Sequence, residues 1–386
     1  MPDNDKVLYE IHENQLDTGL RGFPVGTCRT SSVDKETGVS YVGYAIDQLA
    51  PLPTEKVIYL LLNKRLPTDE ELEAFRTDLR SRQSVPDAVF TTLKSLPSDA
   101  HPMEWFITGL LALGMAGKTG DYKQDTLNMI ARINVVTAAI FRLREGWGEP
   151  IPPRDDLSYG ANFSHMLGVP SGHEQLPELL RLFHVLHMDH GGGNLSTFTG
   201  KAVASGLAGV YVSLAGAMGA LYGPLHGRAN QECLKFVQEV GTSDEAEIER
   251  FVRDLVAKGG KVFGFGHAVL RAEDPRARVQ YAFGEEHFGD HPLVRTALAL
   301  RKVVPPILKE HPKISNPYPN VDAISGSLLC AAGLNEPEYY TVLFGWSRVV
   351  GIAAQIIDER HTLRGGKGVP IYRPRYVAEE QPKQSL

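Results

Sequence analysis

The sequence predicts an all-α protein. Apolar residues recur at helical spacing through most of the chain, and strand-like alternation is confined to residues 7–11 and 39–42. Because 386 residues exceed what a single core usually holds, we expect two domains or one large helical body. The predicted helices cover residues 54–64, 69–82, 86–95, 103–116, 125–145, 176–189, 195–221, 228–239, 244–257, 292–310, 322–333 and 336–357.

Breaks rich in proline and glycine separate these segments and set their ends. The chain after Gly365 is polar and rich in proline, which predicts an extended tail. The breaks fall at residues 146–153, 168–173, 223–227, 264–266 and 316–319.

The composition gives no reason to expect a nucleic-acid partner, because the net charge is −6. The cysteines, Cys28, Cys233 and Cys330, are far apart and odd in number. They form neither a disulfide framework nor a metal motif, and they fit a reducing compartment. Residues 1–6 are polar and lack the character of a secretory signal or a transit peptide. We therefore expect a cytoplasmic protein.

The longest uncharged stretch, residues 202–227, is long enough to span a bilayer. It is rich in Gly, Ala and Ser rather than Leu and Ile, and such small residues let helices approach closely. We interpret it as a tightly packed helix at a subunit interface, and we expect no membrane association.

A single arginine interrupts the most apolar predicted helix. Arg348 is the only charge between Glu338 and Asp358, so this helix is expected to be buried nearly all round. A buried guanidinium is costly unless an anion meets it, and its planar fork fits a carboxylate or a phosphate. Taken alone, Arg348 is more consistent with an internal ion pair than with an acidic ligand. The other motifs favour the ligand.

Three histidines follow one side of the helix that leads to a triple glycine. His184, His187 and His190 are spaced at i, i+3 and i+6. They are either partly buried structural residues or part of a ligand site. Together with Asp189 they also allow a metal site, although helix spacing alone is a weak signal of one.

Two further histidines lie in glycine-rich turns. His226 follows Gly-Pro-Leu and precedes glycine, which permits close backbone approach and unusual dihedral angles. It is either a donor to a ligand or a turn residue. His267 follows Gly-Phe-Gly and precedes Arg271 and Arg276, which indicates a loop that handles anions. Asp274 would instead pair with one of these arginines at the surface.

An aspartate follows a stiff segment with two prolines, at the start of a predicted helix. Asp322 comes after Asn-Pro-Tyr-Pro-Asn-Val. An aspartate at this position is most often the N-cap of its helix, and local sequence favours that role for Asp322.

These motifs and their order resemble the citrate synthase family. The resemblance runs from about residue 8 to about residue 375 and is closest to the dimeric type found in mitochondria and some bacteria. Gly19-Leu20-Arg21-Gly22 is similar to an early arginine turn of the family. The matching stretches are residues 187–196, 221–232, 261–276, 316–326 and 339–355.

The resemblance implies a large helical domain, residues 1–225 and 333–386, and a small helical domain, residues 226–332, that close over the substrate. It implies condensation of acetyl-CoA with oxaloacetate to give citrate and CoA. No cofactor beyond the substrates and no metal is implied. It also implies a homodimer with shared active sites.

The same resemblance implies the catalytic roles. Asp322 would be the base that removes a proton from the acetyl methyl group. His226 would hydrogen-bond the thioester oxygen and stabilise the enol or enolate, and His267 would donate to the ketone oxygen of oxaloacetate. A weak carbon acid needs this help, because its anion must be stabilised as it forms.

The resemblance also implies the binding residues. Oxaloacetate would be held by His190, Arg276, Arg348 and Arg373, the last from the partner subunit. CoA would contact Arg21, Arg271 and the backbone of residues 261–267. Two positions depart from the family pattern. Gly191 stands where relatives carry an acidic residue, and Ser315 stands where they often carry a lysine, which Lys313 would replace.

Three other readings remain open at this point. A 2-methylcitrate synthase would share the fold and the catalytic residues but take propionyl-CoA, and one methylene is worth only about 1–3 kcal/mol of discrimination. A metal-dependent hydrolase would use His187, Asp189 and His190. A helical interaction protein without activity would leave the catalytic pattern unexplained.

Overall fold

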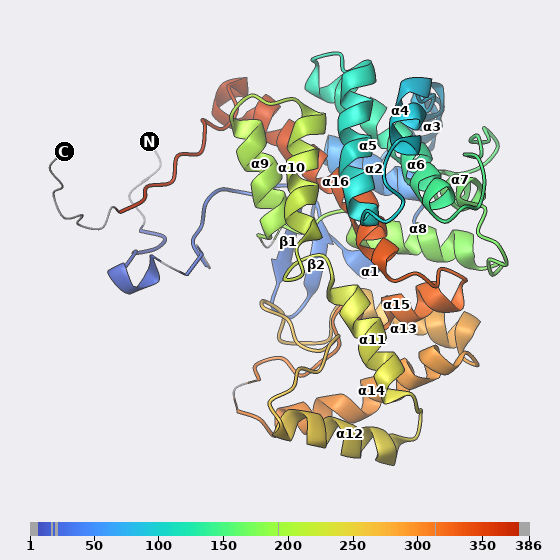
Figure 1. Ribbon diagram of the computed structural model, residues 1–386. Coiled ribbons are helices and arrows are strands. Elements are labelled where there is room, and N and C mark those ends of the chain that lie inside the picture. Colours follow the sequence, from blue (N-terminus) through green and yellow to red (C-terminus); the bar gives the residue numbers. More distant parts are fainter. Residues whose placement is uncertain (1–6, 17, 20–21, 192, 313, 378–386) are drawn as a thin grey trace, which may run out of the picture.

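The computed structural model describes residues 7–16, 18–19, 22–191, 193–312 and 314–377. This part of the chain is mainly helical (Figure 1), which confirms the predicted all-α class. Its helices are α1 (Ile46–Leu49), α2 (Thr54–Asn63), α3 (Asp69–Arg82), α4 (Asp87–Lys94), α5 (Pro102–Gly117), α6 (Tyr122–Arg144), α7 (Tyr159–Leu167), α8 (Leu176–His187), α9 (Leu195–Ser205), α10 (Val210–Tyr222), α11 (Ala229–Val240), α12 (Glu245–Ala257), α13 (Pro275–Phe288), α14 (Pro292–Lys309), α15 (Asp322–Ala331) and α16 (Glu338–Thr362), with short 3-10 helices at Glu13–Gln15 and Leu363–Gly366.

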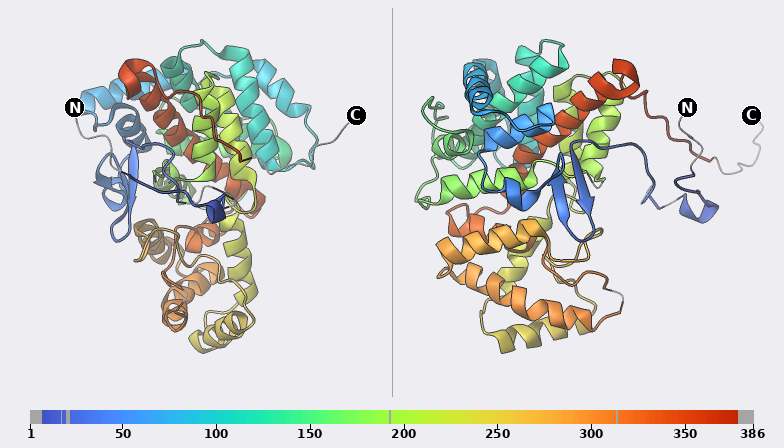
Figure 2. Two further views of the ribbon diagram at one scale, coloured as in Figure 1. Left: turned by 90° about the vertical axis from the view of Figure 1, so that its left-hand side faces the viewer. Right: turned by 180° about the vertical axis from the view of Figure 1, so that it is seen from behind.

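The helices form two lobes. In Figure 1, α2 to α10 and α16 make the upper lobe and α11 to α15 the lower one, and Figure 2 shows the same separation from two further sides. A second apolar core fills the lower lobe between α11, α12 and α14. The main core continues from the upper lobe into α13 and α15. The domain boundaries after residues 225 and 332 therefore stay a prediction.

Helix α16 is the central helix of the upper lobe. It contacts α2, α5, α6, α8, α9 and α10. Gly351 permits the contact with the end of α8, because a Cβ there would lie 2.2 Å from the carbonyl oxygen of Met188. The segments Tyr122–Arg144 and Glu338–Gly366 are long and apolar enough to cross a membrane, but 83% and 94% of their apolar windows are buried. That burial is typical of core helices.

A small antiparallel sheet lies where the two lobes meet (Figure 1). Its strands β1 (Ser31–Asp34), β2 (Gly38–Tyr41) and β3 (Tyr44–Ala45) follow one another in sheet order. β2 overlaps the predicted strand-like stretch 39–42 and contacts α13 of the lower lobe. Tyr41 of β2 is fully buried and donates its hydroxyl proton to the carbonyl oxygen of Val185 at 3.1 Å.

The structure corrects several predicted elements. Residues 7–11 form no strand, since their apolar side chains are exposed and no neighbouring strand pairs with them. The predicted helix 195–221 is two helices, α9 and α10. Gly206 ends α9, and Leu207 takes a φ of +67° that no α-helix continues through. The periodic pattern also missed α1, α7 and α13. α13 buries polar residues such as Gln280, which hides its apolar face.

Candidate active site

The buried arginine of α16 has no acidic partner within ion-pair distance among the described residues. Arg348 is 2% exposed, and its Nε–H donates to the carbonyl oxygen of His187 at 2.8 Å. Burial lowers the pKa of Arg348 to about 10, and the nearby Tyr41 and Asp189 oppose this shift. Among the described residues the internal ion pair that the sequence alone favoured is therefore absent, and the contacting group is a neutral carbonyl.

The second predicted substrate arginine is paired inside the protein. Arg276 is 3% exposed, and its Nη2 lies 2.7 Å from Oδ2 of Asp274, which also caps the start of α13. Burial alone would raise the pKa of Asp274, but the charge and hydrogen bonds of Arg276 outweigh it, and the pKa ends below its usual value. Asp274 does pair with a neighbouring arginine, as one reading expected, but in the interior rather than at the surface.

Two loops of the lower lobe pair and bring His267 close to the start of α15. Asn320 donates its backbone N–H to Gly264 and its side-chain amide to Gly266, each across 2.9 Å. Gly264 has a φ of +80°, and a Cβ there would lie 2.6 Å from Sγ of Cys233 and 2.8 Å from Cα of Ala323. Only glycine fits both the backbone angle and the space.

The hydrogen bonds of His267 fix which ring nitrogen carries the proton. Its Nδ1 accepts from the backbone N–H groups of Val269 and Leu270, each at 3.0 Å. Burial lowers the pKa of His267, and the charge of Arg276 lowers it further. The ring is therefore neutral with the proton on Nε2, which leaves Nε2–H as its donor.

His226 has the opposite arrangement, in the turn between α10 and α11. Its Nε2 accepts from the backbone N–H of Ser196 at 3.2 Å and lies 2.9 Å from the hydroxyl oxygen of that residue. Burial lowers the pKa of His226 to about 4, and Arg348 contributes in the same direction. The neutral ring therefore carries its proton on Nδ1. Neighbouring Leu225 is 98% exposed, so this turn faces solvent on one side.

Asp322 is the first residue of α15, and Val321 is the N-cap residue. Its carboxylate accepts no hydrogen bond from the described residues, so the cap function that local sequence favoured is wrong. Burial raises the pKa of Asp322 to about 6, although Arg276 and Arg348 lie close enough to oppose the shift. A carboxylate with a raised pKa near buried arginines is typical of a catalytic base.

Aromatic and electrostatic contacts join these groups into one site. The rings of His190 and His267 are 6.1 Å apart. The ring of Phe344 lies 6.4 Å from that of His226 and 4.7 Å from the guanidinium carbon of Arg348. Burial lowers the pKa of His190 well below its usual value, and the nearby arginines add to this shift. His190 is therefore neutral, and its buried Nδ1 has no partner among the described residues.

Two of the three histidines at helical spacing, His184 and His187, pack against aromatic rings, and the second of them belongs to the metal alternative of His187, Asp189 and His190. His184 packs against Trp346 with ring centroids 4.1 Å apart, and His187 stacks on Phe183 at 4.0 Å. Burial lowers the pKa of both histidines to about 3. No group of three or more His, Cys, Asp or Glu side chains in the described ranges could hold a metal ion.

Of the predicted CoA and partner residues, Arg271 lies beside His267, Arg373 lies in the extended tail, and the others lie outside the described part of the chain. Arg21 and Lys313 lie outside the described residues. Arg271 is exposed, and its Nη1 donates to the carbonyl oxygen of Leu270 at 2.8 Å. Arg373 is exposed in the extended tail, as predicted for the segment after Gly365, and contacts none of the site residues named above.

Sequence reasoning missed several residues that support the site. Ser196 orients His226, and Tyr41 lies beside both substrate arginines. Phe344 separates His226 from Arg348. Local sequence gave one usable signal, the Asn194-x-Ser196 pair at the start of α9, where the Asn194 side chain accepts the N–H of Thr197 at 3.0 Å.

Known proteins with similar sequences support the resemblance to citrate synthases. The family model for the C-terminal domain of citrate synthase matches residues 19–375. A mitochondrial citrate synthase from Daucus carota is 40% identical over 94% of this chain and 81% of its own length. A mitochondrial 2-methylcitrate synthase from Yarrowia lipolytica is 36% identical over 97% of this chain and 86% of its own.

Solved structures share the fold. Citrate synthase from Thermotoga maritima superposes with a TM-score of 0.81 at 29% identity, over 95% of this chain and 97% of that one. The enzyme from Thermoplasma acidophilum, in a ternary complex with carboxymethyl coenzyme A and oxaloacetate, superposes with a TM-score of 0.83 over 96% and 98%. Its identity of 24% supports the fold alone.

These matches place the chain among the acyltransferases that act on CoA thioesters. More narrowly, it belongs to the citrate synthase family. The predicted cytoplasmic location is contradicted, because relatives from Daucus carota, Arabidopsis thaliana, Citrus maxima and Saccharomyces cerevisiae are named mitochondrial. Unpaired cysteines indicate a reducing compartment but do not identify which one.

Proposed function

We propose that this site condenses acetyl-CoA with oxaloacetate through an enol or enolate intermediate. One observation carries the proposal. Two neutral histidines with opposite tautomers, His226 and His267, and a carboxylate with a raised pKa, Asp322, share a site with two buried arginines. Such a set can remove a carbon-bound proton and stabilise negative charge on two different oxygens.

Oxaloacetate is dianionic, and the charges of the site support its binding. Arg348 offers its terminal nitrogens to a carboxylate, because only its Nε–H is hydrogen-bonded to the described residues. Arg276 is held by Asp274 through Nε and Nη2, which leaves Nη1 for a second carboxylate. His190 adds a neutral ring between them and His267. Desolvated cations of this kind bind an anion more strongly than exposed ones do.

The reaction then proceeds in three steps. The Asp322 carboxylate takes a proton from the acetyl methyl group, while Nδ1–H of His226 donates to the thioester oxygen that becomes negative. The new carbon nucleophile attacks the ketone carbon of oxaloacetate, and Nε2–H of His267 donates its proton to the ketone oxygen. Water finally hydrolyses the thioester of the product, which releases citrate, the CoA thiol and one proton, and the proton held by Asp322 restores the Nε2–H of His267.

The CoA moiety is assigned by resemblance to Arg21, Arg271 and Lys313. The exposed turn around Leu225 supports an approach of the thioester from the solvent side of His226. Closure of a small domain, residues 226–332, over a large domain, residues 1–225 and 333–386, would exclude water from this approach.

A homodimer is part of the proposal. Apolar side chains are exposed on neighbouring helices of the upper lobe, with Met115 of α5 at 76% and Val212 of α10 at 51%. Arg373 is exposed in the extended C-terminal tail. A C2 dimer would cover the apolar side chains and give each oxaloacetate site an Arg373 from the partner subunit.

A thiol-release assay with purified protein, oxaloacetate and acetyl-CoA tests the activity directly. Free CoA should appear only when both substrates are present. The same assay with propionyl-CoA distinguishes the two candidate substrates. One methylene is expected to make the two kcat/KM values differ by about 10–200-fold, which is measurable. The 40% identity to a citrate synthase, against 36% to a 2-methylcitrate synthase, favours acetyl-CoA. Higher kcat/KM with propionyl-CoA would contradict the assignment.

A further inference from the structure

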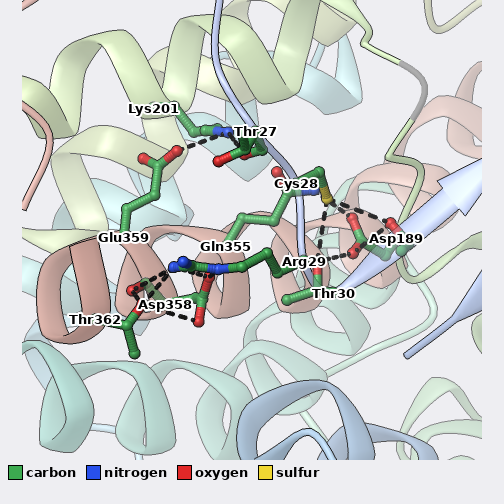
Figure 3. A network of polar contacts seen from close by, with 11 residues as sticks. Thr27, Cys28, Arg29, Thr30, Asp189, Lys201, Gln355, Asp358, Glu359 and Thr362 are labelled. Atoms are coloured by element: carbon green, nitrogen blue, oxygen red, sulfur yellow. Dashed lines mark hydrogen bonds and ion pairs between the residues drawn. The ribbon is translucent and has the colours of Figure 1, made fainter. Parts of the chain in front are cut away.

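A buried carboxylate that forms no ion pair with the described residues lies under the proposed oxaloacetate site. Asp189 precedes His190 and is fully buried. Its Oδ1 accepts the His190 N–H at 2.8 Å and Nε2–H of Gln355 at 2.7 Å. Its Oδ2 accepts the hydroxyls of Thr30 at 2.5 Å and Ser31 at 2.8 Å (Figure 3). Each oxygen therefore has two donors, and all four come from neutral groups.

This arrangement joins three separate parts of the chain at one carboxylate. Thr30 and Ser31 come from the segment that enters β1, Gln355 comes from α16, and Asp189 follows α8 (Figure 3). Gln355 lies seven residues, or two turns, after Arg348 on α16, so both side chains project from the same face of the helix. One helix face thus contacts the proposed substrate with Arg348 and the carboxylate beneath it with Gln355.

The glycine that departs from the family pattern makes the close contact possible. A Cβ on Gly191 would lie 2.0 Å from the carbonyl oxygen of Ser31 and 2.6 Å from its carbonyl carbon. Neither group is a flexible side-chain end, so any larger residue at position 191 would push β1 away from the His190 loop. The segment 27–31 is also held to α16 by an ion pair between Arg29 and Asp358 at 2.7 Å (Figure 3).

We propose that Asp189 is a positioning residue for oxaloacetate, with Thr30, Ser31 and Gln355 as its donors. It fixes the backbone of His190 and holds the His190 loop against both β1 and α16. Its charge also supports the cationic form of Arg348, which forms no ion pair with the described residues. The inference rests on the proposed oxaloacetate site and identifies Asp189 as the residue that orders this site. A carboxylate that served only folding would not affect one substrate more than the other.

The test removes single donors to Asp189 without touching the carboxylate or the substrate. Thr30→Val deletes one hydroxyl at nearly constant volume, Thr30→Ser keeps it, and Gln355→Met removes a donor from another element. Thr137→Val is the matched control, because Thr137 is equally buried in α6 and its hydroxyl has no partner among the described residues. Arg348→Leu is the reference for loss of oxaloacetate binding.

Thr30→Val and Gln355→Met should each raise KM for oxaloacetate about tenfold. They should leave KM for acetyl-CoA unchanged and kcat within about twofold. Thr30→Ser and Thr137→Val should match the parent.

The positioning function is overturned if KM for oxaloacetate is unchanged in both donor variants while Arg348→Leu raises it. That outcome leaves the proposed site intact. An unchanged KM in Arg348→Leu contradicts the site itself. If Thr30→Val does not fold, Gln355→Met decides.

A second pair of variants tests the contact between β1 and the His190 loop. Gly191→Ala should raise KM for oxaloacetate at least as much as Thr30→Val, since its Cβ would collide with the Ser31 backbone. Gly219→Ala is the control, because a Cβ on Gly219 meets no atom within 4 Å. Equal oxaloacetate affinity of both variants and the parent, measured by titration calorimetry, would show that the contact does not order the site.

Discussion

Nε of Arg348 lies 2.8 Å from the carbonyl oxygen of His187, at the end of α8. The contact orients the guanidinium without neutralising it, because a carbonyl is polar but uncharged. The remaining nitrogens therefore stay available in a buried setting, where attraction to an anion is stronger than in water. A substrate anion would supply the missing charge.

Replacing this arginine tests whether its charge serves binding rather than folding. Arg348→Leu should raise KM for oxaloacetate by about 10- to 100-fold, the range expected for a lost hydrogen bond to a charged group. The melting temperature should stay near that of the parent, because the described residues offer Arg348 no ion pair to lose. Thermal unfolding and steady-state kinetics measure both. A large fall in melting temperature would instead indicate an internal electrostatic partner.

Removing the proposed base should separate chemistry from binding. In Asp322→Asn the amide keeps the shape of the carboxylate but cannot accept a proton. The expected loss in kcat is about 10²–10⁴-fold, the usual contribution of general base catalysis, with oxaloacetate affinity preserved. Calorimetry of oxaloacetate binding checks that the affinity is preserved. Near-normal turnover of the variant would show that Asp322 is not the base.

The raised pKa of Asp322 predicts how activity depends on pH. The base must be ionised, so kcat/KM should fall as the pH drops through about 6. The pKa of His226 is lowered to about 4, so its ring stays neutral there, and the pKa of His267 is lowered as well. A flat profile between pH 5 and pH 7 would contradict this assignment.

The same shift predicts an effect on stability. The folded-state pKa of Asp322 lies above its unfolded value, so its stabilising contribution is complete below about pH 3.8 and is lost as the pH rises through about 6. Asp322→Asn removes this loss. The variant should therefore gain more in melting temperature at pH 7.5 than at pH 5. Equal gains at both values would show that burial does not penalise the ionised carboxylate.

Chelation should leave turnover unchanged. Asp189, the acid of the metal alternative, already accepts hydrogen bonds at both oxygens, and His184 and His187 are packed against aromatic rings. Thiol release should therefore proceed at the parent rate after dialysis against excess EDTA. If EDTA abolished the activity and zinc restored it, the result would support the metal-dependent hydrolase alternative.

Subunit exchange tests the shared active site. Asp322→Asn and Arg373→Ala should each be nearly inactive as homodimers. In a mixed heterodimer, if Arg373 acts on the partner's site, one site contains both defects and the other contains none. Verified heterodimers should then recover up to about half the parent activity per dimer. If the activity of verified heterodimers does not exceed that of the two variant homodimers, each subunit completes its own site.

Periodicity predicted most of the fold because most helices have one apolar face. It failed where polar side chains are buried with the apolar ones. α13 places Arg276 and Gln280 in the interior, so its pattern does not look amphipathic. The split between α9 and α10 was missed for another reason. Local angles at Leu207 depend on how the two helices pack, and no composition signal records that.

The motifs identified the polar side chains of the site, but not their protonation states. Sequence could show that His226 and His267 lie in glycine-rich turns. It could not show that one accepts at Nε2 and the other at Nδ1, because these contacts come from Ser196 and from the backbone after His267. The same limit applied to Asp322. Its cap-like position in sequence is common, and only burial distinguishes it from an ordinary helix start.

The central position of α16 has a consequence for synthesis of the chain. The helix that contacts six others in the upper lobe is the last of the α-helices in the described residues and follows the whole of α11 to α15. The ribosome therefore synthesises the whole lower lobe before it synthesises α16, the central helix of the upper lobe. Nascent chains halted near residue 335 should expose the apolar faces of α5, α6 and α8, and recruit chaperones that chains halted after residue 366 no longer bind.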